Sequence, residues 1–380
     1  MIMRKSESLV LWNTDKLKFY NILVIKILKV FISVLFLFNI LGKEKVYAQA
    51  VIASSGEAVT QAVTLENLMI METLRDFQDE NMGRNKWAAG YGYGGFARGR
   101  NMEPDPVTQN PYKYAQKSGG FILAADWQFS PYARRGIYFT YNNTRLKTKG
   151  ISAETQDALY ENVETNNFFW GAYTKYSGAF GYFIGSMAGG YSHLHENRQF
   201  LQNASGQPFL VNGHADTGAW RALVYGEIGT EYRVFASIIQ PFWGLQYYYS
   251  RYGSVEEELT YASASDVGQL GRVRTNSFRS ILGLRICHPL PPVFRSVASF
   301  DFMTYWVHEF LDFGQVGQIS VQNFGETELF SGIYAGRDWA ILAPVLTFQW
   351  GRAKIWGSYN LMFNADETIN MGMVGLEILW

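Results

Sequence analysis

The chain has 380 residues and a balanced charge, with 33 Lys and Arg against 33 Asp and Glu. This balance gives no electrostatic reason to expect a nucleic-acid partner, and the single cysteine excludes an internal disulfide framework. The mean hydropathy of -0.10 excludes a bundle of membrane helices. Aromatic residues make up 16% of the chain and charged residues only 17%, which fits an ordinary soluble enzyme poorly. The class that remains possible is a β protein whose surface tolerates aromatic side chains.

The first segment, residues 1–50, has the features of an export signal with a long front end. A basic region is followed by a short apolar core over 30–41 and by the small-x-small pattern Ala48-Gln49-Ala50. The apolar run is shorter than the about 20 residues that a membrane helix needs. We therefore expect the export machinery to recognise this segment and cleavage to follow Ala50. An uncleaved anchor is the alternative.

Beyond residue 86, side chains alternate with the period of two that is typical of β-strands. Trp220, Val224 and Ile228 share one face of their stretch, whereas Arg221 and Glu227 lie on the other. An apolar face of this kind fits a strand that points it toward lipid. The pattern predicts about twelve strands of roughly 10 to 16 residues, over 87–94, 121–129, 134–145, 164–176, 180–194, 220–232, 237–250, 276–287, 295–309, 339–350, 353–363 and 368–380.

The connections between these strands alternate in length. Long polar stretches lie at 99–117, 146–163, 195–217, 251–275 and 311–338, and short links lie at 130–131, 177–178, 235–236, 288–293 and 351–352. Outer-membrane barrels show this asymmetry, with short periplasmic turns and longer loops at the cell surface. The sequence therefore predicts an all-β fold: a transmembrane antiparallel β-barrel over 86–380 in the outer membrane of a Gram-negative-type cell. A soluble β fold is the less favoured alternative.

Aromatic residues gather near strand ends, as at 247–249, Tyr305-Trp306 and Trp350. In a barrel they belong to the interfacial girdles, where a ring lies half in hydrocarbon and half in water. The alternative is an exposed carbohydrate-binding row. That alternative would place the aromatics in the long loops, and most of them lie elsewhere.

The chain ends on an aromatic residue at the close of an alternating strand. Val374, Leu376, Ile378 and Trp380 share one face of this strand. The arrangement resembles the carboxy-terminal signal read by the barrel assembly machinery. We therefore expect that machinery and outer-membrane lipid to be partners, with the last strand sealing against the first.

The segment 51–85 is predicted to be a linker that contains an α-helix over about 57–81. This stretch has no Gly or Pro and places apolar residues at helical intervals. A helix of this length would extend about 37 Å, which is enough to cross the hydrocarbon inside a pore. Its acidic residues are expected to face charges that line the lumen, namely Arg221, Glu227, Glu231, Arg233, Arg279 and Arg285.

Residues 57–380 resemble the translocator domain of autotransporters, the type V secretion proteins. Degenerate patterns carry the resemblance in order, among them Trp170-Gly171-Ala172-Tyr173, Gly189-Gly190-Tyr191, Glu227-Ile228-Gly229-Thr230-Glu231, Leu282-Gly283-Leu284-Arg285 and Gly375-Leu376-Glu377-Ile378-Leu379-Trp380. The resemblance implies a twelve-stranded barrel threaded by a helix, which moves or anchors a passenger at the cell surface. Two departures stand out: little room for a passenger before the helix, and no Asn-Asn pair within 57–81 for self-cleavage.

Catalytic and metal-binding candidates are few. His193 and His195 share one face of a strand, but the sequence indicates no third metal ligand, so both are interpreted as solvated residues. Asp301 and Glu309 fall on the lumenal face and His308 on the lipid-facing one, which argues against an acid/base site. We expect no cofactor, no metal and no enzymatic activity.

The leading functional prediction is therefore a monomeric translocator or membrane anchor with little or no passenger. The first alternative is a stand-alone porin-like channel or a surface adhesin that binds through its long loops. An outer-membrane hydrolase ranks third.

Overall fold

The structure is a computed structural model. It describes residues 84–99, 113–130, 132–151, 158–178, 180–204, 207–253, 255–261, 264–270, 274–293, 296–311, 316–321, 327–331, 337–364 and 367–379. The predicted export signal, the predicted helix over 57–81 and Trp380 lie outside the described residues. Within the described ranges, no helix has the length and apolarity to cross a membrane.

The described residues form one antiparallel sheet of seventeen strands. Twelve of them, 11 to 24 residues long, run the length of the barrel: β1 (Arg84–Gly99), β2 (Lys113–Ser130), β3 (Ala133–Ile151), β4 (Ala158–Gly178), β5 (Gly181–Ala204), β6 (Gln207–Gly229), β8 (Ser237–Tyr252), β11 (Arg274–Val293), β12 (Ser296–Glu309), β15 (Asp338–Trp350), β16 (Ala353–Phe363) and β17 (Glu367–Leu379). Five are short: β7 (Tyr232–Val234), β9 (Val255–Tyr261), β10 (Ala264–Leu270), β13 (Val316–Val321) and β14 (Thr327–Ser331). The predicted number of long strands is confirmed.

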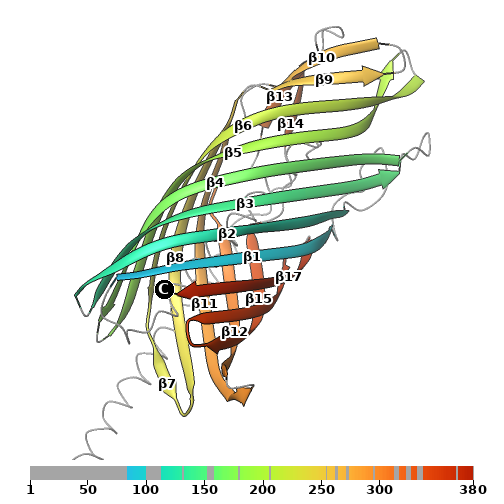
Figure 1. The fold of residues 1–380 in the computed structure, drawn as a ribbon. Coiled ribbons are helices and arrows are strands. Elements are labelled where there is room, and N and C mark those ends of the chain that lie inside the picture. The colour runs from blue at the N-terminus through green and yellow to red at the C-terminus, as the bar shows by residue number, and fades with distance from the viewer. Residues whose placement is uncertain are drawn as a thin grey trace, which may run out of the picture. The chain divides into compact units, whose positions relative to one another are not determined.

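The sheet closes on itself. Each long strand pairs with the next long strand along the chain, and β17 pairs with β1 from Trp87 opposite Leu379 to Gly99 opposite Glu367. Figure 1 shows β1 and β17 side by side, although they lie at opposite ends of the barrel sequence. Closure gives the backbone groups of both terminal strands hydrogen-bonding partners, which an open sheet edge would lack.

The two faces of the sheet differ as the alternation predicts. On β6 the outward side chains Trp220, Val224 and Ile228 are 68%, 51% and 54% exposed. Every second residue between them, at 221, 223, 225 and 227, points inward and is buried, including Arg221 and Glu227. The apolar face is therefore the outer one, as a barrel in lipid requires.

Inside the barrel, aromatic rings lie over glycines of the neighbouring strand. The Tyr173 ring covers Gly136, and the Tyr138 ring covers Gly171, so that a Cβ atom at either glycine would collide with the ring. The two Tyr rings lie 6.2 Å apart between centroids. Glycine is required at these positions because only a residue without a side chain lets a ring lie flat on the strand.

The outer face changes from apolar to polar partway along the strands. The rings of Tyr191 and Trp220 lie opposite each other on β5 and β6, with centroids 5.3 Å apart. The outward side chains that follow are His193, His195 and Asp216. The aromatic pair therefore marks one edge of the lipid-facing band.

The strands continue past this edge. The sequence predicted a loop over 195–217, but β5 extends to Ala204 and β6 begins at Gln207. That prediction was wrong because the polarity change marks the end of the hydrocarbon, whereas backbone pairing can continue in water. The same holds for the predicted loops over 146–163, 251–275 and 311–338, parts of which are strand in β3 and β4, β9 and β10, and β13 and β14.

At the opposite end, the connections are short, as predicted. The turns at 235–236 and 351–352 are confirmed, whereas the turn predicted at 177–178 lies between Gly178 and Gly181. The Pro-rich link predicted over 288–293 was wrong, because this segment belongs to β11. Its pairing with β8 ends at Cys287, so the prolines lie where β11 has one strand neighbour and no donor is needed on the other side.

Val224 lies midway between Trp220 and Ile228 on the outer face of β6. Replacing Val224 by Arg should destabilise the barrel by about 2–4 kcal/mol, because a charge is then held in hydrocarbon. Denaturant unfolding in lipid vesicles measures the effect. The matched control is Gln199→Arg on the polar part of β5, which should leave the unfolding free energy close to that of the native barrel. Equal destabilisation by both variants would contradict the assigned lipid-facing band.

Candidate functional site

The inner wall of the barrel carries buried charges that are paired with one another. Arg285 on β11 reaches Asp301 on β12, with Nη2 and Nε at 2.7 and 2.8 Å from Oδ1. Gln240 on β8 accepts a further hydrogen bond from Arg285 at 3.3 Å. This cluster ties three neighbouring strands together.

A second pair lies on the same two strands, nearer the start of β11 and at the end of β12. Arg279 and Glu309 face each other in the register of β11 and β12, and Nε donates to Oε2 over 2.8 Å. The carboxylate also accepts hydrogen bonds from the Ser277 hydroxyl and from the backbone N–H groups of Phe278 and Leu311. Glu309 therefore fixes the end of β12 as well as neutralising the guanidinium.

Arg221 is part of a polar network that crosses several strands. Its Nη1 donates to Asn167 Oδ1 over 2.7 Å, and its Nη2 donates to the Tyr252 hydroxyl over 3.3 Å. Asn167 in turn contacts Asn142 and Ser192. The network joins β3, β4, β5, β6 and β8.

The remaining lumenal candidates divide into buried and exposed residues. Glu227 is buried and accepts hydrogen bonds from the hydroxyls of Tyr182 and Tyr225. Glu231 and Arg233, in contrast, are exposed at the short-turn end, where Arg233 Nε lies 3.5 Å from Glu231 Oε1. These two residues are placed outside the buried inner wall because the paired part of β6 ends at Gly229. The predicted contact of all six residues with a helix stays a prediction.

Sequence reasoning missed two further pairs of inward charges. Asp126 accepts a hydrogen bond from the Tyr173 hydroxyl over 2.7 Å and lies 3.6 Å from Arg134 Nε. Lys354 lies 3.3 Å from Glu377 across β16 and β17. The signal that identifies such residues is a charged side chain on the inward parity of an otherwise apolar strand.

The structure separates the members of the acid/base candidate. Asp301 and Glu309 are buried on the inner face and bound to arginines, whereas His308 lies on the outer face between the rings of Trp306 and Phe310. His308 Nδ1 instead pairs with Asp338 at 2.8 Å. The three residues therefore do not share one site.

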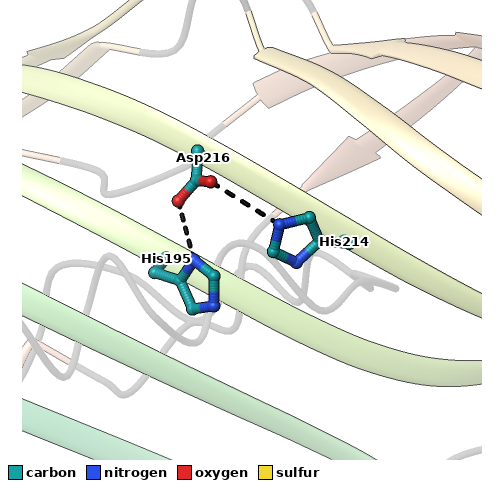
Figure 2. Close-up of side chains that lie close together, drawn as sticks. All are labelled: His195, His214 and Asp216. Carbon is teal, nitrogen blue, oxygen red and sulfur yellow. Dashed lines mark hydrogen bonds and ion pairs between the residues drawn. The ribbon is translucent and has the colours of Figure 1, made fainter.

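A second polar group lies on the outer face, beyond the Tyr191 and Trp220 rings. His195 on β5 meets His214 and Asp216 on β6 (Figure 2). His193, also on β5, lies 3.8 Å from Asp216. A hydrogen bond from His195 lowers the pKa of Asp216. The sequence places His193 and His195 on one face but indicates no third ligand, because His214 and Asp216 are brought next to His195 only by the register of β5 with β6.

The closed sheet, its apolar outer band and its paired inner charges define the class of protein: an outer-membrane β-barrel. The sequence model of the family described as "Autotransporter beta-domain" matches residues 88–360. The chain therefore belongs to the autotransporter β-domain family, whose members are outer-membrane translocators.

Three solved structures are similar to this chain, and the first of them, with a TM-score above 0.5, supports the fold. The translocator domain of the autotransporter NalP from Neisseria meningitidis is similar with a TM-score of 0.59 and 11% identity, covering 87% of this chain and 99% of that one. The transport unit of the autotransporter AIDA-I from Escherichia coli is similar with a TM-score of 0.49 and 14% identity, covering 80% of this chain and 92% of that one. The β-domain of the Bordetella autotransporter BrkA is similar with a TM-score of 0.47 and 13% identity, covering 79% of this chain and 100% of that one. No curated protein sequence gives a significant match to this chain.

Replacing Asp301 by Ala should lower the unfolding free energy by about 3–5 kcal/mol, because the buried Arg285 guanidinium loses its carboxylate. The matched control is Arg233→Ala, which breaks the exposed pair with Glu231 and should cost about 0–1 kcal/mol. Urea titration of the refolded barrel measures both. Similar losses in the two variants would show that burial of the inner pair has no energetic consequence.

Proposed function

We propose that this barrel is a translocator and membrane anchor whose pore is occupied by the chain's own segment 57–81 as a helix. Family membership supports the translocator role. The observation that supports the plug lies on the inner wall of β6 and β8, where some buried polar atoms have no hydrogen-bond partner among the described residues.

Two residues of this wall keep buried polar atoms free of hydrogen bonds within the described part of the chain. The atoms are Nε of Arg221 and both amide atoms of Gln246. Leaving such atoms unpaired costs free energy, so a polar occupant of the lumen is favoured. Segment 57–81 supplies one, since Glu66 and Glu72 fall within it.

The proposal includes no enzymatic activity. The two inward carboxylates of the acid/base candidate, Asp301 and Glu309, are both bound to arginines. A carboxylate that is held in this way is a poor general base, because its lone pairs already accept charged hydrogen bonds. The inner charges serve instead to fix the strands and to line the pore.

The last strand is proposed to guide assembly. The outward side chains of β17 include Val374, Leu376 and Ile378, which are 66%, 44% and 43% exposed. We infer that the barrel assembly machinery reads this row together with Trp380, after residues 1–50 have directed export. Because β17 and β1 pair with each other, neither long terminal strand offers an open edge to a second copy, which favours a monomer.

Deleting 57–81 should convert a mostly closed channel into one with a large, steady conductance, because the occupant of the pore is lost. Planar-bilayer recording measures this change. A matched deletion of 51–56, which keeps the segment intact, should leave the channel closed. A large steady conductance of the unaltered protein would favour the porin-like alternative over the plugged translocator.

Deleting Trp380 should lower the amount of folded barrel in the outer membrane of cells, because the assembly signal is weakened. Refolding of the same purified variant in detergent should be close to that of the native chain, since the signal acts through the machinery. Trp170→Ala, which removes an exposed aromatic of β4, a strand that does not pair with β17, is the control and should retain cellular assembly. Parallel losses in cells and in detergent would assign Trp380 to stability alone.

A further inference from the structure

Two strands carry imidazoles and a carboxylate into the solvent-facing part of the barrel wall. The paired strands β5 and β6 extend well beyond the rings of Tyr191 and Trp220, as far as Ala204 opposite Gln207. On the outer face of this extension lie His195 and, on the facing strand, His214 and Asp216 (Figure 2). Three of the five histidines of the chain, counting His193, lie in this group.

The register of the two strands builds the cluster. His195 lies directly opposite Asp216, and Asn197 lies directly opposite His214. His195 Nδ1 is 2.7 Å from Asp216 Oδ1, and His214 Nε2 is 3.5 Å from Asp216 Oδ2. One ligand atom from each of the three residues lies within 4.8 Å of the others. The two imidazole rings are 4.7 Å apart between centroids.

We propose that His195, His214 and Asp216 form a binding site for a divalent transition-metal ion such as Zn²⁺ on the cell-surface side of the barrel wall. The site is separate from the pore and does not depend on the plug. Two imidazoles and one carboxylate on one face are a common ligand set for such ions, and they leave positions open to solvent.

The spacing of the ligand atoms suits a small ion. Metal–ligand bonds to imidazole nitrogen and carboxylate oxygen measure about 2.0–2.2 Å, so ligand atoms around one ion lie about 3–4 Å apart. Of the two separations from Asp216, the one of 3.5 Å lies within this range and the one of 2.7 Å lies just below it. All three side chains are 41 to 51% exposed, which leaves them room for the small rotations that coordination requires.

The charge balance around the cluster also favours a cation. Among the described residues, Asp216 makes ion pairs with imidazoles alone, and no Lys or Arg nitrogen lies within 4.0 Å of it. The nearby Arg145 forms an ion pair with Glu164, with Nη2 at 3.1 Å from Oε1. With the histidines neutral, the cluster therefore keeps one carboxylate charge that a metal ion can neutralise.

Asn197 orients the His214 imidazole from the side. Its Oδ1 accepts a hydrogen bond from His214 Nδ1 over 2.8 Å, so that Nε2 of His214 presents its lone pair toward Asp216. Metal-binding histidines usually donate in this way from the second ring nitrogen. The Asn197 Nδ2 lies 3.1 Å from His195 Nε2, a contact that opens when His195 binds through Nδ1, because Nε2 then carries the ring proton. His193 Nε2 lies 3.8 Å from Asp216 Oδ1, within reach of a fourth coordination position.

The test is Zn²⁺ binding to the purified full-length barrel in detergent, without a histidine tag, by competition with a chromophoric chelator. All proteins carry Cys287→Ser, which removes the single thiol of the chain. We expect one ion per chain. We expect the double variant His195→Ala/His214→Ala to weaken binding at least about 100-fold, and Asn197→Ala to weaken it about 10- to 100-fold as loss of an orienting residue does.

The matched control is His288→Ala, which removes an exposed histidine at the short-turn end, where it contacts Ser237. This variant should bind Zn²⁺ as the parent does. Migration of unheated samples on gels reports that each variant remains a folded barrel. Unchanged Zn²⁺ affinity in the double variant, or no binding by the parent, would overturn the proposal.

Discussion

The structure depends on one constraint: every backbone N–H and C=O group within the lipid must find a partner inside the protein. The pairing of β17 with β1 meets this requirement, because it removes both edges of the sheet at once. The outward row of β17, with Val374 and Leu376, adds apolar surface where the seam faces lipid. The last strand of the chain is therefore both the closing element and a part of the membrane-facing band.

Closure also creates an interior, and that interior determines which polar residues the strands can carry. Arg285 is tolerated because Asp301 lies on the next strand, and Arg221 because Asn167 and Tyr252 converge on it. Each guanidinium is thus bound to the wall rather than left for catalysis. Such a lining suits a family of translocators, in which the barrel frames a passage and chemistry is not required of it.

The sheet extends farther than the membrane. Up to the rings of Tyr191 and Trp220 the outer face belongs to lipid, and beyond them the same strands form a ribbon in water. Outward polar side chains on these strands can be hydrated only beyond the two rings. The cluster of His195, His214 and Asp216 lies on this ribbon, so a single pair of strands anchors the barrel at one end and displays a ligand set at the other.

The sequence by itself determined the two faces of each strand, the number of long strands and the fold class, because the period of two follows from strand geometry alone. Trp220 and Arg221 could be assigned to opposite faces in this way. It did not determine where strands end, since polarity reports the solvent rather than the backbone hydrogen bonding of β5 and β6. Only the tertiary structure decided the register between strands. That register brought Asp216 opposite His195, a neighbour that no pattern within one strand contains.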